Sequence, residues 1–312
     1  MTADDMNAIE TRSTPLPWDA FFGHVSAHIA HVYVRVARDE SQEPFTLRGW
    51  VRGPRCRHSR TLPAQFPLRD LGSGPTHLAE ARVTDPTFWS PELPAIYDLN
   101  VEFCRQDCVL QQFRATVGIR RLGSVNQSLR LEQQRWVPRG LSLSHPTPAD
   151  IASAREHDVA LRCDRPSDAV CAEASEQGVL MIADVSEPDP FDELRRLARW
   201  ASVGMVIVPN LTATTMTHLR KQLPNLLFAQ PVHPGQTTVE RSVEAAGYDL
   251  FFCEVDDVAS YHVWASTNTQ PVIVQRRTRE PVTIATARAA CDRLQRDLAP
   301  PGNEAGYFVQ GR

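Results

Sequence analysis

The stretch RATVGIRRLGSVNQSLRLEQQRWVPRGLSLSH, residues 114–145, separates two sequence patterns. Before it, apolar and polar residues alternate in short runs; after it, short apolar runs alternate with segments of helical periodicity. The first pattern is typical of half-buried antiparallel strands, and the second is typical of repeated strand–helix units. The stretch therefore predicts a boundary between two architectures, which we set between residues 128 and 129.

The upstream part predicts a β-sandwich over residues 19–128, preceded by a loose polar arm over residues 1–18 that Pro15 and Pro17 close. Proline-rich loops separate several of its strands. The segments with the alternation of strands that bury one face are 30–36, 46–52, 78–83, 98–103 and 108–114. Short alternating strands joined by such loops over about 100 residues indicate two packed sheets.

The downstream part predicts a compact closed (β/α)₈ barrel over residues 129–312. Thr147, Pro148 and Asp150 form the start signal of a helix, and Ser167 and Gly178 bound a second helix. The further predicted helices are 191–201, 216–223, 238–246, a short element near Tyr261, and 283–298. The predicted barrel strands are 136–141, 159–162, 179–184, 204–210, 226–230, 250–255, 271–275 and 306–310. Eight strands with helices between them fit a TIM-type barrel, shorter here than the usual length of about 250 residues.

Composition excludes several classes of function. The chain has 33 basic and 37 acidic residues, a net charge of −4, which disfavours nucleic acid or an anionic membrane as the partner. No run approaches the roughly 20 apolar residues that span a bilayer, and the first 20 residues lack the pattern of a signal peptide. We therefore expect a cytoplasmic protein.

Cysteine and glycine patterns predict neither a metal nor a cofactor. The seven cysteines are dispersed, which favours reduced thiols. Cys104 and Cys108 flank a short hairpin loop, so pairing between them stays open, although two unpaired thiols are the favoured interpretation. No Cys or His spacing resembles a zinc site, and no Gly-rich phosphate loop indicates a nucleotide.

The order of the two parts, together with four short motifs, resembles glycoside hydrolase family 2, the family of β-galactosidases, β-glucuronidases and β-mannosidases. The motifs are DPTFWSPELPAIYDL at 85–99, Gly-Ile-Arg at 118–120, Arg-Gly at 139–140 and Leu-Arg at 161–162. This resemblance implies that the sandwich is immunoglobulin-like and that the barrel carries a glycosidase site at the carboxyl ends of its strands.

The catalytic positions that the resemblance implies are occupied by the wrong residues. The family's acid is a glutamate directly after an asparagine at the end of the fourth strand, and its nucleophile is a glutamate that ends the seventh strand. The matching positions here are Asn210, Leu211 and Gln275. Leucine has no proton to donate, and an amide is a far poorer nucleophile than a carboxylate. We therefore predict no catalytic residue at either family position.

Other residues can replace the missing pair. Asp184 and Glu254 end the third and sixth strands, and they are the fallback carboxylates of an active enzyme; the alternative is that they are solvated loop acids or helix caps. Arg162 either contacts a ligand or pairs with Asp184. The predicted ligand-binding residues are Arg162, Asp184, Asn210, Glu254 and Gln275.

Thiols and aromatic rings offer weaker candidates. Cys163 and Cys253 lie near strand ends, but no histidine is placed by sequence beside either of them, and buried thiols are commonly core residues. Trp136 and Trp264 can stack on a sugar ring, although packing is the more common role of such tryptophans.

Three hypotheses follow. The first is a non-catalytic family 2-like protein that binds carbohydrate in the residual cleft, or a protein partner. The second is an active glycosidase with relocated carboxylates, and the third is a scaffold subunit whose barrel mouth is closed by side chains. An open polar cleft at the strand ends favours the first hypothesis over the third.

Overall fold

A computed structural model of the chain describes most of the sequence. The described residues are 18–37, 45–106, 108–186, 190–208, 211–234, 247–299 and 304–311. The arm predicted over residues 1–18 (apart from Trp18), the helix predicted over 238–246, and Asn210 lie outside these ranges.

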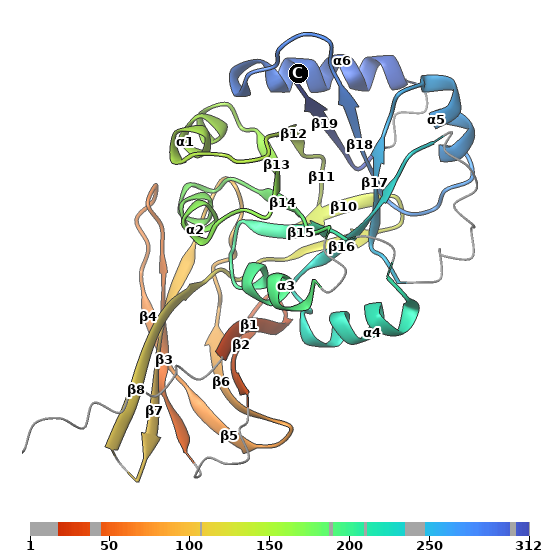
Figure 1. Ribbon diagram of the computed structural model, residues 1–312. Helices are drawn as coiled ribbons and strands as arrows, with labels where there is room; N and C mark the ends of the chain where they lie inside the picture. The colour runs from red at the N-terminus through yellow and green to blue at the C-terminus, as the bar shows by residue number, and fades with distance from the viewer. Residues whose placement is uncertain are drawn as a thin grey trace, which may run out of the picture.

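Two four-stranded antiparallel sheets form the first part of the molecule (Figure 1). One sheet has the order β1-β2-β6-β5, with bounds Trp18–Val25, Ile29–Ala37, Thr76–Thr84 and Arg69–Ser73. The other has the order β4-β3-β7-β8, with bounds Ala64–Pro67, Thr46–Arg55, Ile96–Arg105 and Cys108–Val117. Alternate residues such as Val32, Val34, Leu99 and Val101 are fully buried between the sheets, as a half-buried strand requires.

A closed barrel of eight parallel strands follows, in the order of the sequence. Its strands are β12 (Arg139–Ser142), β13 (Ala160–Asp164), β14 (Met181–Asp184), β15 (Val203–Ile207), β16 (Leu227–Val232), β17 (Leu250–Glu254), β18 (Val272–Arg277) and β19 (Gly306–Gln310). The described helices are α1 (Pro148–Glu156), α2 (Asp168–Gln177), α3 (Phe191–Ala198), α4 (Ala213–Gln222), α5 (Val258–Ala265) and α6 (Ile284–Leu298). The predicted sandwich followed by a (β/α)₈ barrel is confirmed.

The first two barrel helices begin where the sequence signals place them, whereas α3 ends at Ala198 rather than at 201 and α4 begins at Ala213 rather than at 216. Thr147 and Asp150 form a reciprocal capping box on α1, and Ser167 accepts from the backbone N–H of Val170 at the start of α2. Gly178 ends α2 with φ of 81°, a left-handed conformation that favours glycine. Among the described residues, no helix is long and apolar enough to cross a membrane.

A small sheet that the sequence analysis missed lies between the two parts. Its strands, in the order β11-β10-β9, are β9 (Leu122–Val125), β10 (Ser128–Leu131) and β11 (Gln134–Trp136). The strand predicted over 136–141 is therefore wrong at its start: Trp136 belongs to β11, and the barrel strand begins at Arg139. Pro138 separates the two because it has no N–H to continue a ladder.

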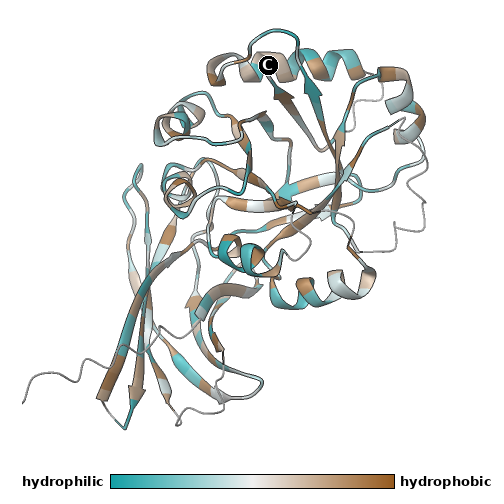
Figure 2. Cartoon of the chain, viewed as in Figure 1, coloured by the Kyte–Doolittle hydropathy of each residue, from teal (hydrophilic) through white to brown (hydrophobic). Residues whose placement is uncertain are grey.

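Sandwich and small sheet together close the amino-terminal end of the barrel. Leu129 of β10 packs in one cluster with Leu180, Leu250 and Ala305, which lie at or just before the starts of barrel strands. Trp89, from the sandwich, belongs to the same cluster, is fully buried, and donates from its indole N–H to the carbonyl of Ser175 at 2.8 Å. Figure 2 shows hydrophobic colour along the barrel strands that meet this cluster.

Arg120 fastens the end of the sandwich to the barrel. Its guanidinium is buried and donates to the carbonyls of Trp200, at 3.0 Å, of Ala201, and of Asn225, at 2.8 Å. Burial lowers the pKa of Arg120 to about 9. Gly118 permits the close approach, since a Cβ at that position would lie 2.2 Å from the Cβ of Ala201.

Five predicted sandwich strands are confirmed to within three residues at each end, whereas β1, β4 and β5 were missed.

All seven cysteines are free thiols. Cys104 is buried and Cys108 is exposed, in agreement with the interpretation of two unpaired thiols.

Candidate functional site

The barrel interior changes from apolar to polar toward the carboxyl ends of its strands. Phe252, Ile273 and Phe308 pack inside the barrel. Two residues further along the same three strands are Glu254, Gln275 and Gln310. Because side chains of a strand alternate between its two faces, these three polar side chains point to the same side as the inner apolar layer. They begin a polar layer at the mouth of the barrel.

Gln275, which the resemblance led us to match with the family's nucleophile, is the most enclosed member of this layer. β18 is the seventh strand of the barrel, as predicted, and the side chain of Gln275 has no exposed surface. Its Oε1 accepts from the hydroxyl of Ser142 and from Nη1 of Arg162 at 3.1 Å, while its Nε2 donates to Oε1 of Gln310 at 3.3 Å. Both ends of the amide are therefore used within the protein.

Arg162 and Asp184 form an ion pair across neighbouring strands β13 and β14. The other carboxylate oxygen of Asp184 accepts from the hydroxyl of Ser186 at 2.9 Å. The side chains of Arg162 and Asp184 are 20% and 15% exposed, and the guanidinium also lies 5.0 Å from the ring centroid of Phe252. Of the two roles predicted for Arg162, ligand contact or pairing with Asp184, the structure shows the pairing.

Glu254 has a separate set of partners. Nε of Arg277 lies 2.6 Å from one oxygen, and Nδ1 of His233 lies 3.7 Å from the other. Glu254 is 16% exposed, but Arg277 and His233 are 68% and 44% exposed. These three side chains form the rim of the mouth, and the contacts of Glu254 are distinct from those of Asp184.

Leu211, which the resemblance led us to match with the family's acid, follows the fourth barrel strand, β15. Its side chain is half-buried against the core between the barrel strands and the helices, and its N–H donates to the hydroxyl of Tyr248 at 2.9 Å. Leucine therefore serves as a packing residue here.

Neither of the two tryptophans considered as sugar platforms stands free. Trp264 packs edge-on against Phe251 in the outer core, with ring centroids 5.5 Å apart. Trp136 packs against the cluster at the opposite end of the barrel. Both have the packing role.

The two thiols near strand ends are poor nucleophiles. Cys163 and Cys253 are buried, and burial raises the pKa of both thiols well above the usual value. A thiol is reactive as its thiolate, so these side chains act as core residues. Among the described residues, no group of three or more His, Cys, Asp or Glu side chains is placed to hold a metal ion.

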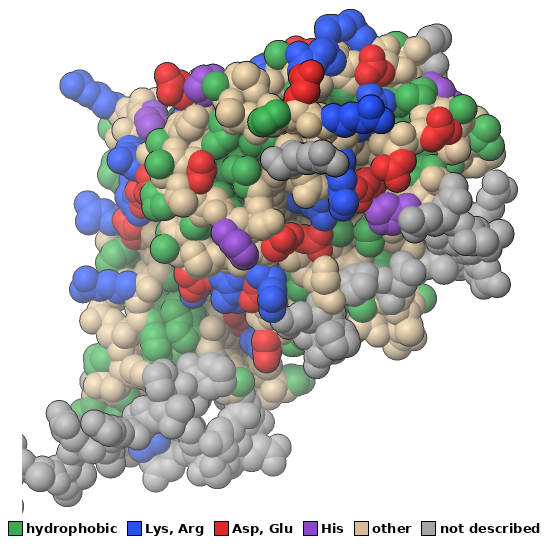
Figure 3. Space-filling view, turned by 45° about the horizontal axis from the view of Figure 1, so that its top comes forward, with side chains coloured by type: hydrophobic (Ala, Val, Ile, Leu, Met, Phe, Trp, Pro, Cys, Tyr) green, Lys and Arg blue, Asp and Glu red, His purple; other side chains and the backbone are tan. Residues whose placement is uncertain are grey.

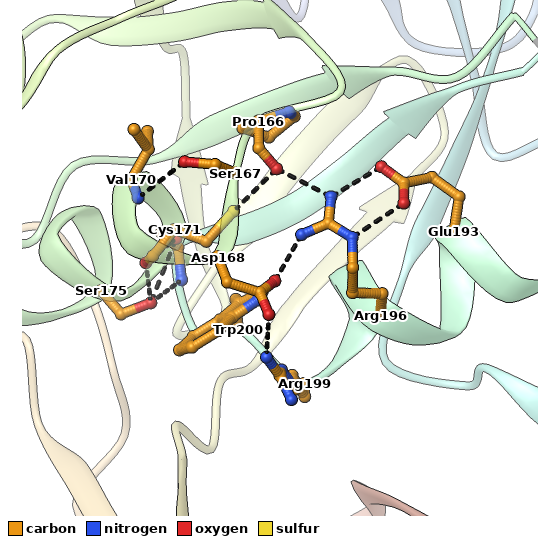
Figure 4. Close-up of polar contacts among 11 residues, drawn as sticks. Pro166, Ser167, Asp168, Val170, Cys171, Ser175, Glu193, Arg196, Arg199 and Trp200 are labelled. Carbon is orange, nitrogen blue, oxygen red and sulfur yellow. Dashed lines mark hydrogen bonds and ion pairs between the residues drawn. The ribbon is translucent and has the colours of Figure 1, made fainter. Parts of the chain in front are cut away.

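A second charged cluster, between α2 and α3, has a structural role (Figure 4). The carboxylate of Asp168 accepts from Arg196, from Arg199 and, at 3.2 Å, from the indole N–H of Trp200. Glu193 holds the other side of Arg196 with contacts of 2.6 and 2.8 Å, and this bonding raises the pKa of Arg196. The cluster joins the start of α2 to the end of α3.

Sequence reasoning missed four members of the mouth: Ser142, His233, Arg277 and Gln310. The alternation of side chains along a strand could have predicted three of them, because each lies two residues beyond an inward-facing position of its own strand. These are Ser142 after Gly140, Arg277 after Gln275, and Gln310 after Phe308. His233 lies beyond the end of β16, where this alternation no longer applies.

Figure 3 shows that acidic and basic side chains lie side by side on the upper face of the molecule.

Residues 55–120 match the family model Glycosyl hydrolases family 2. This region contains the motif at 85–99 and Gly-Ile-Arg at 118–120, and it lies in the sandwich. No protein with a curated description matches the chain.

Solved structures share the fold. A glycosyl hydrolase family 2 member from Bacteroides cellulosilyticus has a TM-score of 0.67 at 16% identity, and the match covers 94% of this chain and 43% of that one. A beta-glycosidase from Bacteroides vulgatus has a TM-score of 0.62 at 13% identity, and the match covers 85% of this chain and 39% of that one. A beta-D-glucuronidase from Dictyoglomus thermophilum has a TM-score of 0.63 at 12% identity, and the match covers 94% of this chain and 61% of that one.

The chain therefore has the sandwich-and-barrel fold of glycosyl hydrolase family 2, as its motifs predicted. It spans between 39 and 61% of the length of these three structures.

Proposed function

We propose that this chain is a non-hydrolytic relative of family 2 glycosidases that binds carbohydrate at the barrel mouth. The observation that carries the first half of the proposal is the state of Gln275. An amide stands where the family resemblance implies a nucleophilic glutamate, and its oxygen and nitrogen are both engaged by Ser142, Arg162 and Gln310. This side chain closes the polar layer and has no free atom to attack an anomeric carbon.

The two fallback carboxylates, Asp184 and Glu254, also have partners within the protein. A retaining glycosidase needs one carboxyl group that carries a proton and another that attacks, about 5 Å apart. Asp184 is held by Arg162 and Ser186, whereas Glu254 is held by Arg277 and faces His233. Each carboxylate has its own cationic partner, which supports a structural or binding role over a relocated catalytic pair.

The rim supports binding. Arg277 and His233 expose much of their side chains around Glu254. Carboxylates accept hydrogen bonds from sugar hydroxyls, and guanidinium groups donate to them. A hydroxyl-rich ligand can therefore exchange contacts with this rim without entering the closed layer around Gln275.

Hydrolysis is tested with aryl β-galactosides, β-glucuronides and β-mannosides. We expect no turnover above that of buffer. Turnover in the ordinary enzymatic range of about 1–1000 s⁻¹, if it is lost in Asp184→Asn or Glu254→Gln, would contradict the proposal. Asp164→Asn is the matched control, since Asp164 ends the adjacent strand β13 with an exposed side chain.

Binding is tested by calorimetry and thermal shift with the corresponding free sugars and short oligosaccharides. We expect saturable binding that weakens in Glu254→Gln and in Arg277→Ala but not in Asp164→Asn. Binding that none of the rim variants changes would place the ligand elsewhere and refute this part of the proposal.

A scaffold role is the second candidate, and one observation favours it. Gln275 is fully buried and its partners come from strands β12, β13 and β19, so the inner part of the mouth is filled by the protein itself. If no sugar binds, while the double change Leu211→Glu with Gln275→Glu yields a folded but inactive protein, the scaffold role is the better description.

A further inference from the structure

β8, residues Cys108–Val117, is the outer edge strand of its sheet. It pairs with β7 on one side, and among the described residues no strand pairs with its other side. Figure 1 shows β8 at the margin of the sandwich, with its beginning far from the barrel. An open edge presents backbone N–H and C=O groups that can pair with another strand.

The other sheet edges carry the features that block such pairing. β4 has four residues and ends at Pro67. β5 has a register irregularity between Asp70 and Gly72. β1 has one between Phe22 and Val25, and Asp19 in β1 is paired with Arg195 of α3 at 3.3 Å. Short strands, bulges, proline and covering elements are the usual protection of an edge.

β8 lacks most of this protection. It has ten residues, no proline and one charged side chain, Arg114. Its register with β7 is irregular only near its start, so residues 111–117 run without a break. Val109 and Leu110 are 52% and 55% exposed. A long edge with exposed apolar residues is a typical pairing surface.

We propose that β8 pairs antiparallel with β8 of a second copy of this chain, about a two-fold axis near Gln112. The two four-stranded sheets would then form one continuous sheet of eight strands. A two-fold axis brings a surface against itself, so the surface has to be self-complementary. With Gln112 on the axis, Arg114 lies opposite Leu110 of the second copy, and Val109 lies opposite Ala115.

Charge favours a second copy over another partner. The strand carries a single charge, so this register places no like charges opposite each other, and the stem of Arg114 covers the exposed Leu110. A partner selected by charge would need a pattern of charges, which β8 does not offer.

Sedimentation equilibrium of the full chain, from low to high micromolar concentration, tests the proposal. We expect a reversible rise toward twice the chain mass of 34.9 kDa. Leu110→Lys should raise the dissociation constant by at least about tenfold, because it places a lysine opposite Arg114. Leu62→Lys, at a loop position that is 93% exposed, is the matched control and should leave the dimer unchanged.

Crosslinking tests the geometry. In a Cys108→Ser background, Gln112→Cys should form an intermolecular disulfide under mild oxidation, because the two cysteines would meet at the axis. Arg82→Cys, exposed on the central strand β6, should not. A chain that stays monomeric throughout overturns the proposal, and so does a dimer that neither crosslinks through Gln112→Cys nor responds to Leu110→Lys.

Discussion

The two ends of the barrel are built on different principles. The amino-terminal end is closed by apolar side chains from the sandwich, the small sheet and the barrel. The buried cation Arg120 meets backbone carbonyls there, and its guanidinium lies 5.8 Å from the ring centroid of Phe22. The carboxyl-terminal mouth is a layer of amides and paired charges around Gln275. One end holds the domains together, and the other is where a barrel enzyme keeps its chemistry.

This difference explains what the family resemblance can and cannot predict. Trp89, Gly118 and Arg120 all lie in the recognisable motifs, and all of them pack the sandwich onto the barrel. These motif residues therefore predict the fold because they build the junction. Of the motif residues, Arg162 lies in the mouth, but no motif contains Leu211 or Gln275, the positions where the resemblance led us to expect glutamates.

Removing Arg120 should produce the largest effect, because it breaks the junction itself. Arg120→Met removes the guanidinium that donates to three carbonyls, of which that of Trp200 has another donor, the N–H of Val203. We expect a loss of about 3–5 kcal/mol in the free energy of unfolding. Urea unfolding measures it. Arg82→Met, on the exposed face of β6, should change stability by about 0.5 kcal/mol or less. Similar losses for the two variants would mean that the junction does not depend on Arg120.

Removing Arg162 should break the mouth at a smaller cost. Arg162→Met leaves Asp184 without its cation and Gln275 with one donor fewer, a loss of about 2–3 kcal/mol in a layer that retains some solvent contact. Asp184→Asn in the same chain should recover about 1 kcal/mol, since the unpaired charge is gone. A double-mutant cycle measures the coupling, and strictly additive losses would contradict the ion pair.

A pH titration tests the apolar layer between the barrel strands and the helices, where Cys291 is buried. Burial raises the pKa of Cys291 to about 11, from 9.0. Below pH 9 the folded and unfolded thiols are both protonated. Above it the unfolded chain loses its proton first, so the contribution of this group to stability falls until the pH passes about 11.

At pH 10.5 this loss amounts to about 2 kcal/mol. The difference in unfolding free energy between the native sequence and Cys291→Ala should therefore shrink by that amount between pH 8 and pH 10.5. Cys108→Ala, which removes an exposed thiol, should show no such change. A constant difference for Cys291→Ala across this range would mean that the thiol is not protonated preferentially in the fold.

Sequence reasoning predicted the two architectures because periodicity is local. The alternation in residues 98–103 and the capping box at Thr147 and Asp150 need no distant partner. It missed β9, β10 and β11 because these strands have three or four residues each, too few to show a period. It identified Arg162, Asp184, Glu254 and Gln275 as strand-end residues, but their partners depend on the closure of the barrel: Gln275 meets Gln310 only because the last strand pairs with its neighbours.

The rim should be the least sensitive part of the molecule. Arg277 is 68% exposed, and solvent weakens its pairing with Glu254, so Arg277→Ala should cost about 0.5 kcal/mol or less. The effect should vanish at high salt, whereas the loss caused by Arg120→Met should not, because buried contacts are poorly screened. Unfolding of both variants at low and high salt gives the comparison. If Arg277→Ala proved as costly as Arg162→Met and independent of salt, the rim would be part of the buried layer, and its proposed availability to a ligand would be wrong.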